Sequence, residues 1–149
     1  MGRALSIKPL TLDSEIAGLL RNTKSIALEI ASSKQHRDSH KILRFLIDYG
    51  YDVYPINPAY QGMEIAGRTV YANISDVPVA IDLVDIFRRS ESVMPIVSAA
   101  IKKDAKAIWM QLGVVNDEAA ALANAAGLQV VMDRCPAIDI PRYQSLGLL

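Results

Sequence analysis

The segment that most constrains the fold is residues 107–136, which read as a strand, a loop, a helix and a second strand. Residues 107–111 form a short apolar run, and Asn116 stands where a helix N-cap is expected. Gly127 ends the helix, and residues 128–132 form a second apolar run. Two strands joined by one helix in this way predict a right-handed parallel crossover.

The carboxyl ends of these strands are the expected place for a ligand, because open parallel sheets bind ligands outside that edge. The loops 111–115 and 133–136 would both lie there, and Gly113 leaves the first loop free to turn. The segment contains no catalytic cluster, so it indicates a binding fold and names no reaction.

The rest of the chain repeats the alternation of strands and helices. We predict further strands at 25–30, 51–56 and 83–87, and helices at 13–21, at 39–49 and from Ser90 or Ser92 to 103. Between the second and third strands, a connection rich in turn residues includes an extended piece near Val70 and Tyr71. We therefore expect a three-layer, Rossmann-like α/β fold with five mainly parallel strands in the order 3-2-1-4-5 and helices on both faces. The switch point would then lie between the first and fourth strands, with the ligand over residues 31–37 and 111–114.

Composition narrows the class of protein. A chain of 149 residues suits one domain over 1–149, with peripheral tails at 1–12 and 142–149. Sixteen basic residues balance sixteen acidic ones, so no general field draws the chain to nucleic acid or to an anionic membrane. No uncharged apolar run approaches the roughly 20 residues that span a bilayer. The single cysteine excludes an internal disulfide and fits a reducing compartment, which indicates a cytoplasmic protein.

Several strings of the sequence carry a family resemblance over about residues 13–141. They are KSIALEIASS, YPINPAY, DLVDIFRRSESV, WMQLGVVNDEAA and GLQVVMDRCP. They resemble the small stand-alone CoA-binding domain family, relatives of the nucleotide-binding domain of the succinyl-CoA synthetase alpha subunit. The resemblance implies a Rossmann-like fold and a site for coenzyme A or an acyl-CoA.

The loop after the first strand is the candidate phosphate site, because it leads into a helix N-terminus. The loop residues that we assign to this site are Ala31, Ser32, Ser33, Lys34 and Arg37. A dinucleotide fingerprint would place glycines here, and the family resemblance calls for glycine at position 30, but this chain has Glu29 and Ile30. These two residues can be interpreted in two ways. In the first they weaken phosphate binding, with the Glu29 carboxylate either beside the phosphates or buried unpaired in a central strand. In the second they are tolerated, with Glu29 facing solvent at the strand end and Ile30 packing.

The end of the second strand argues against a nicotinamide cofactor. NAD-binding folds place a carboxylate there for the ribose hydroxyls, whereas this chain has Asn57 and Pro58. A neutral Asn57 suits the 3′-phosphate of CoA, and the alternative is that the pair only forms a turn. NAD is therefore not the expected ligand.

The third and fourth strands add further candidates at the same edge. Arg88 and Arg89 can pair with phosphates through their guanidinium groups, and Phe87 can flank an adenine. The alternative for the arginines is a solvated pair before a helix. For Gln111 and Gly113 we expect contacts through the backbone.

Cys135 follows the last strand at the binding edge. A catalytic cysteine needs a base, and the sequence places neither His36 nor His40 beside it, so exposed or hydrogen-bonding roles are expected for both histidines. A mixed disulfide with a bound thiol such as CoA is a further possibility for Cys135.

The sequence thus predicts a protein that binds CoA or acyl-CoA in a binding or regulatory role, and the resemblance does not imply enzymatic turnover. No metal motif and no stripe of basic and aromatic residues for nucleic acid is present. Two alternatives stay open: a protein-interaction module that has lost its ligand, and an acyl-CoA-dependent enzyme that uses Cys135. The protein partner is undetermined, and both a monomer and a homodimer fit.

Overall fold

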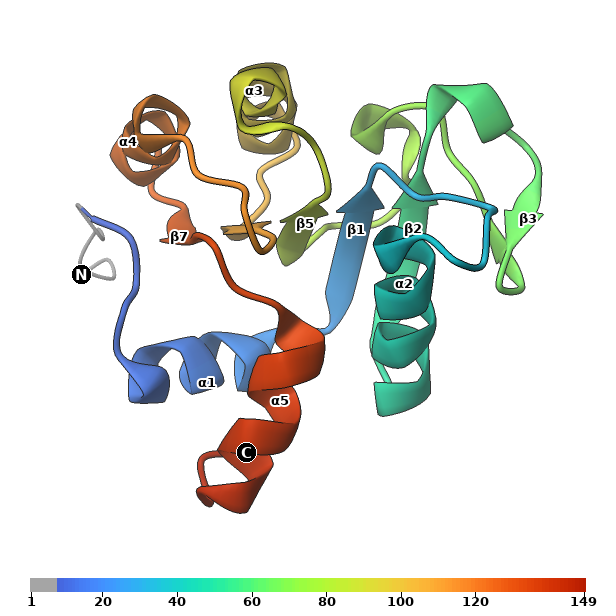
Figure 1. The fold of residues 1–149 in the computed structure, drawn as a ribbon. Helices are drawn as coiled ribbons and strands as arrows, with labels where there is room; N and C mark the ends of the chain where they lie inside the picture. The colour runs from blue at the N-terminus through green and yellow to red at the C-terminus, as the bar shows by residue number, and fades with distance from the viewer. Residues whose placement is uncertain (1–7) are drawn as a thin grey trace.

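The computed structural model describes residues 8–149 and has an α/β fold (Figure 1). The main strands are β1 (Ser25–Glu29), β2 (Asp52–Ile56), β5 (Leu83–Ile86), β6 (Ala107–Met110) and β7 (Gln129–Val131). The helices are α1 (Asp13–Asn22), α2 (Asp38–Tyr49), α3 (Val93–Lys102), α4 (Asp117–Ala125) and α5 (Pro136–Ser145). The predicted fold class is confirmed, because the five main strands form one parallel sheet between layers of helices.

The order of the strands differs from the prediction 3-2-1-4-5. It is β2-β1-β5-β6-β7, so the third main strand lies beside the first and next to the fourth. The reason lies in the connection after β2, which packs Ile74, Val77 and Ile81 into the same core cluster as α3. This connection crosses β1 on the face opposite α2, so β5 pairs with the edge of β1 that β2 does not occupy. The switch point therefore lies between β1 and β5.

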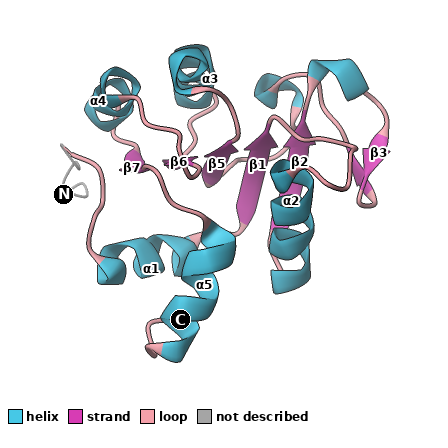
Figure 2. Cartoon of the chain, in the orientation of Figure 1, coloured by secondary structure: helices cyan, strands magenta, loops and turns pink. Residues whose placement is uncertain are grey.

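Helices lie on both faces of the sheet (Figure 2), and a hydrophobic cluster covers each face. In β1, Ile26 and Leu28 point into the cluster with α1, α2 and α5, whereas Ala27 points into the cluster with α3 and α4. This alternation follows from the two-residue period of a strand. Trp109 of β6 is fully buried on the first face.

The connection after β2, where we expect an extended piece near Val70 and Tyr71, contains a small hairpin just before these residues. Strands β3 (Glu64–Ile65) and β4 (Arg68–Thr69) pair in antiparallel register, and Tyr71 forms a parallel bridge to Ile56. Figure 1 shows this hairpin beyond β2, at the end of the sheet. Through the bridge at Tyr71, this connection covers part of the β2 edge of the sheet, whose backbone groups would otherwise be unpaired.

The segments expected to be peripheral contribute to the core. The range 142–149 begins inside α5, and its Tyr143 is fully buried. The neighbouring Arg142 donates from Nη2 to Oδ1 of Asp13 at 2.6 Å, which joins α5 to α1. At the other end, residues 1–7 lie outside the described residues, and the backbone N of Leu10 donates to the carbonyl oxygen of Val130 at 2.7 Å. None of the helices within residues 8–149 has the length and apolar character needed to cross a membrane.

Candidate functional site

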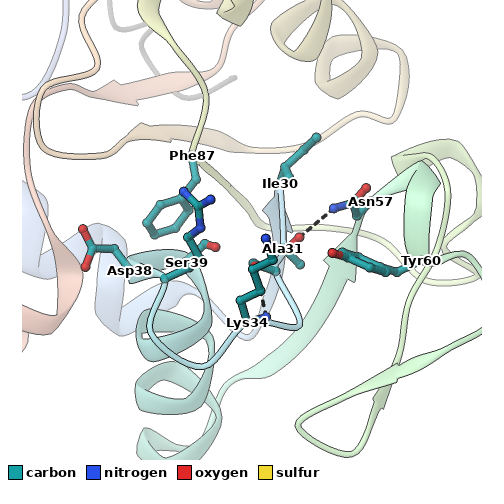
Figure 3. Close-up of a pocket in the computed structure, with 10 residues that line it drawn as sticks. Ile30, Ala31, Lys34, Asp38, Ser39, Asn57, Tyr60 and Phe87 are labelled. Carbon is teal, nitrogen blue, oxygen red and sulfur yellow. Dashed lines mark hydrogen bonds between the residues drawn. The ribbon is translucent and has the colours of Figure 1, made fainter.

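Two pockets lie at the carboxyl edge of the sheet around the switch point. The first has a volume of about 400 Å³ and is lined by Ile30, Ala31, Ser32, Lys34, Arg37, Asp38, Ser39, Asn57, Tyr60 and Phe87 (Figure 3). The second has a volume of about 580 Å³ and is lined by Asp38, Lys41, Ile42, Phe87, Arg88, Arg89, Gln111, Leu112, Val114, Cys135 and Ile138. Because Phe87 and Asp38 line both pockets, the two adjoin. In Figure 3 these two side chains lie on one side of the first pocket, with Asn57 and Tyr60 on the other.

Most of the residues assigned to the site from the sequence line these pockets. They are Ala31, Ser32, Lys34, Arg37, Asn57, Phe87, Arg88, Arg89, Gln111 and Cys135. Ser33, Pro58 and Gly113 line neither pocket, and all three are exposed. The corrected strand order places the β5 loop beside the β1 loop, while the loop after β6 contributes to the second pocket alone.

Sequence reasoning missed the first turns of α2. Asp38, Lys41 and Ile42 lie one helical turn apart on one face of that helix and line the second pocket. The sequence did contain a signal for these α2 residues, because the helix that follows the first strand begins at the switch point of such a fold. The missed Leu112 and Ile138 are apolar side chains that are each 57% exposed at the same pocket.

The β1 loop is held by His40. Arg44 donates from Nε to Nε2 of His40 at 2.9 Å, and His40 Nδ1 lies 2.7 Å from the carbonyl oxygen of Ser32. Since the arginine can only donate, Nε2 must accept, and Nδ1 carries the proton that is donated to Ser32. His40 is buried and therefore has the hydrogen-bonding role expected for it.

Asn57 fastens the same loop from the β2 side. Its Nδ2 donates to the carbonyl oxygen of Ala31 at 2.8 Å, and its Oδ1 accepts from the backbone N of Ala59 at 2.9 Å. Only 9% of Asn57 is exposed, so these bonds engage both ends of its amide inside the protein. The turn interpretation of this residue is thus supported, although its side chain still lines the first pocket.

The loops after β5, β6 and β7 are joined to one another. Gly113 has a φ of 80° and donates its backbone N–H to Oδ1 of Asp133 at 2.7 Å. Ser90 accepts at Oγ from the backbone N of Val115 at 3.0 Å, and its carbonyl oxygen accepts from Asn116 at 2.8 Å. Ser90 therefore joins two loops instead of capping α3. The N–H of Gly113, a residue expected to contact a ligand through its backbone, is therefore engaged by Asp133.

The electrostatics of the two pockets favour an anion. Five basic side chains line them, and these are Lys34, Arg37, Lys41, Arg88 and Arg89. The acidic side chain of the lining is Asp38, in the first turn of α2. The N-terminus of this helix adds a partial positive charge. No group of His, Cys, Asp and Glu suited to a metal ion occurs within residues 8–149.

Glu29 lies away from both pockets. It lines a separate hollow of about 370 Å³ on the α3 side of β1, together with Ile74 and Lys103. Its Oε2 is buried and has no hydrogen-bond partner in the described part of the chain. Burial raises the pKa of this carboxyl, and the positive charge of Arg88 partly offsets that rise. Of the positions expected for the Glu29 carboxylate, the structure agrees with burial without a partner in a central strand, whereas Glu29 lines neither candidate phosphate pocket and does not simply face solvent.

Ile30 lines the first pocket, in agreement with its expected place in the phosphate loop. The φ angle of Ile30 is not positive. The conformation of the loop therefore does not demand glycine at this position. What Ile30 changes is the space available in the pocket.

Cys135 is a free, buried cysteine at the second pocket. Among the described residues that line this pocket there is no histidine to act as a base. His40 is also committed, because Ser32 and Arg44 engage its two ring nitrogens. The arrangement therefore provides a thiol beside a cavity without an activating base.

Gln111 lines the second pocket, and its two backbone polar groups are engaged within the protein. Its backbone N donates to the carbonyl oxygen of Ile86 at 3.3 Å, and its own carbonyl oxygen accepts from Val114 at 2.8 Å. With the amide nitrogen toward Asp85, Gln111 donates to Oδ1 at 2.9 Å and to Oδ2 at 3.2 Å. Asp85 is fully buried, and burial raises its pKa well above the usual range for a carboxyl.

This fold is found in related proteins. The chain is 33% identical over 122 residues to the uncharacterized protein YneT of Bacillus subtilis, which covers 82% of this chain and 89% of YneT. It is 31% identical over 93 residues to the alpha subunit of the ADP-forming acetate–CoA ligase I of Pyrococcus furiosus, covering 60% of this chain and 20% of that subunit. The solved structure of a hypothetical protein from Pyrococcus horikoshii superposes with a TM-score of 0.85 and 40% identity, covering 95% of this chain and 98% of the other.

The family assignment rests on a match between this chain and the model of a known domain. Residues 24–141 match the model of the CoA binding domain family, and this range extends from β1 into α5. Every strand of the sheet and every loop that lines the two pockets falls inside the matched range. This protein therefore belongs to the CoA binding domain family.

Proposed function

We propose that this protein binds coenzyme A or an acyl-CoA across the two pockets that adjoin at Phe87. The observation that carries the proposal is their combination at the switch point: two adjoining hollows with five basic side chains between them. CoA has a strongly anionic nucleotide end and a long, uncharged pantetheine arm. A ligand of this kind needs cations at one end and an extended cavity at the other.

We assign the phosphates to the cations around Phe87 and the arm to the second pocket. Arg88 and Arg89 leave β5 at the switch point, and guanidinium groups bind phosphates in bidentate fashion. The second pocket also has apolar side chains in its lining, among them Ile42, Val114 and Ile138. An uncharged arm loses little solvation in such surroundings, whereas a phosphate would lose much.

The proposed role is binding or regulation, without turnover of the ligand. In the described part of the chain, the lining of the two pockets holds a thiol at Cys135 but no histidine, and acyl transfer to that thiol needs a base or another source of activation. We also propose a cytoplasmic location, because a reducing compartment keeps the single free thiol unoxidised.

The test is calorimetric titration of the wild-type protein and of the Arg88→Ala/Arg89→Ala variant with CoA. A hydrogen bond to a charged group contributes about 1.5–3 kcal/mol, so the variant should lose affinity by about tenfold or more. The matched control is Arg21→Ala/Arg68→Ala, which also removes two guanidinium groups but outside both pockets. Its affinity should equal that of the wild type.

Two results would contradict the proposal in different ways. Unchanged affinity in the Arg88→Ala/Arg89→Ala variant would remove both arginines from the site while leaving CoA as the ligand. A wild-type protein that shows neither heat of binding nor thermal stabilisation with CoA would overturn CoA binding, because any ligand that binds the native state alone stabilises the fold by mass action. That second result would favour the protein-interaction module.

A further inference from the structure

We infer that the ligand of this site is an acyl-CoA with an uncharged, apolar acyl chain, and that Leu112 and Ile138 contact this chain. The inference rests on the proposed binding of CoA across the two pockets and names the class of acyl group. It predicts discrimination against free CoA, which carries no chain, and against acyl groups that end in a charge.

Charge is unevenly distributed along the carboxyl edge of the sheet, where the strands follow one another in the order β2-β1-β5-β6-β7 (Figure 2). The charged side chains of the two pockets come from the β1 loop, the first turns of α2 and the β5 loop, and they are Lys34, Arg37, Asp38, Lys41, Arg88 and Arg89. The described lining that follows β6 and β7 is uncharged, and it consists of Gln111, Leu112, Val114, Cys135 and Ile138. The site is therefore cationic toward β1 and β5 and neutral toward β6 and β7.

The charged residues directly after β7 do not change this distribution. Asp133 and Arg134 line neither pocket. Oδ1 of Asp133 accepts from the backbone N of Gly113 at 2.7 Å, and Nε of Arg134 donates to Oδ2 of Asp139 at 2.8 Å. Both side chains are thus engaged by other parts of the protein, and the described lining after β7 provides no ionic partner for a charged acyl group.

This distribution of charge orients a bound CoA. Its phosphates lie at the nucleotide end, and its sulfur lies at the opposite end of the uncharged arm. Neighbouring strands are about 4.8 Å apart, so the β7 loop lies about 10 Å from the β5 loop, a distance that an extended pantetheine arm can span. With the phosphates at the cations near β1 and β5, the arm passes β6 and the sulfur reaches the β7 loop. The group carried by the sulfur then meets Leu112 and Ile138.

Leu112 and Ile138 are exposed apolar side chains from different elements that line the same cavity. Leu112 belongs to the loop after β6 and Ile138 to the first turn of α5, and each is 57% exposed. A single exposed apolar side chain is ordinary in proteins, but these two line one pocket together with the apolar Ile42 and Val114. An apolar chain that covers them removes apolar surface of both partners from water. A terminal carboxylate in the same place would lose solvation without gaining a partner.

The experiment is calorimetric titration of the wild type with CoA, butyryl-CoA, succinyl-CoA and octanoyl-CoA. The butyryl and succinyl groups have the same number of carbon atoms, but the succinyl group ends in a carboxylate. Each methylene that is buried strengthens binding roughly fourfold, so octanoyl-CoA should bind at least about tenfold more tightly than CoA. Butyryl-CoA should bind more tightly than succinyl-CoA.

Two variants test whether these side chains provide the preference. Leu112→Ala/Ile138→Ala should reduce the ratio of octanoyl-CoA affinity to CoA affinity severalfold, whereas Leu112→Met/Ile138→Met keeps the apolar surface and should retain the ratio. The matched control is Leu12→Ala/Leu146→Ala, which truncates side chains that are 61% and 56% exposed and lie outside both pockets. Its ratio should equal that of the wild type.

A further variant reverses the selection instead of removing it. Ile138→Lys places a cation where the inference puts the acyl chain, at a position exposed enough to accept a charged side chain. Succinyl-CoA should then bind more tightly than butyryl-CoA. An unchanged preference for butyryl-CoA in this variant would show that the chain lies elsewhere and would overturn the inference.

The outcomes separate this inference from the proposed function. If the wild type binds CoA and octanoyl-CoA equally well, or succinyl-CoA as tightly as butyryl-CoA, the inference is overturned while CoA binding stands. The inference also fails alone if the alanine pair in the pocket and the control pair change the affinity ratio equally. If the wild type binds none of the four probes, CoA binding itself is overturned and the inference is overturned with it.

Discussion

The side chain of Asn57 ties the carboxyl ends of two neighbouring strands together, because its Nδ2 donates to the carbonyl oxygen of Ala31 at 2.8 Å. Ala31 is fully buried, and its backbone N donates in turn to the carbonyl oxygen of Ile56 at 3.0 Å. The β1 loop is therefore anchored to β2 by two hydrogen bonds before any ligand is present. This anchoring is the reason that a loop without glycine can keep a defined shape at the switch point.

The first prediction concerns this anchor. Asn57→Ala leaves the carbonyl oxygen of Ala31 without its side-chain donor, and a buried acceptor that loses its partner costs about 1–3 kcal/mol. We expect the free energy of unfolding in urea to fall by that amount and CoA affinity to fall with it. Asn73→Ala is the control, because Asn73 makes no side-chain capping bond and lies outside both pockets. Equal unfolding free energies for the two variants would contradict the anchoring role.

The second prediction concerns Ile30. Replacing it with glycine opens space in the first pocket, so Ile30→Gly should strengthen CoA binding. The same change should lower the stability of the ligand-free protein by about 0.5–1 kcal/mol or more, because glycine adds backbone entropy to the unfolded chain. Glu29→Gln is the matched variant next to it in sequence, and it should change affinity less because Glu29 lies outside both pockets. Calorimetric titration decides between them, and weaker binding of Ile30→Gly would mean that Ile30 packs against the ligand.

The third prediction is a dependence of stability on pH that comes from Asp85. Burial raises the pKa of this carboxyl in the folded state well above its value of about 4 in the unfolded chain. The folded state thus holds a proton that the unfolded state releases. The contribution of the protonated carboxyl is fully present below about pH 4 and is lost as the pH rises through the folded-state pKa.

Asp85→Asn removes this dependence, because an amide does not ionise. Its free energy of unfolding should exceed that of the wild type by a larger margin at pH 8 than at pH 5, measured by urea unfolding. Asp48→Asn, at an exposed position on α2, should run parallel to the wild type over the same range. A constant difference between Asp85→Asn and the wild type would show that burial does not hold a proton on this carboxyl.

The fourth prediction concerns Cys135. The thiol is buried and no histidine lines its pocket among the described residues, so we expect it to be unreactive. Cys135→Ser should bind CoA with the affinity of the wild type. Mass spectrometry of the wild-type protein kept with CoA under non-reducing conditions should show the unmodified mass. A gain equal to one CoA, absent from Cys135→Ser, would instead identify a mixed disulfide at this residue.

The elements of the fold were predictable from local patterns, and the order of the strands was not. Asn116 does cap α4, since its Oδ1 accepts from the backbone N of Ala119 at 2.9 Å, as its place in the sequence indicated. Strand order depends instead on which face of β1 the long connection crosses. The deciding contacts are made by Ile74, Val77 and Ile81, whose steps of three and four residues resemble a helical period although only a short 3-10 turn forms there. Helix α5 was missed although Pro136 at its first turn is a known start signal, because Pro141 interrupts the pattern.

The candidate site was likewise predictable only in part. Residue type and position at strand ends were enough to select Lys34, Arg88 and Cys135, which line the pockets. The sequence could not reveal that the N–H of Gly113 belongs to Asp133, because that bond joins loops twenty residues apart. The sequence left several positions open for the Glu29 carboxylate, because the direction of a strand's last side chain depends on where the strand ends.

Trp109 is the only tryptophan of the chain, and it occupies the strand position beside Asp85. Its indole N–H donates to the carbonyl oxygen of Arg134 at 2.7 Å, next to Cys135 in the loop that borders the second pocket. The tryptophan fluorescence of this protein therefore originates from one fully buried ring between Asp85 and the last loop of the sheet. A titration followed at the emission of this ring reports on the environment of Asp85 and Arg134 without any added label.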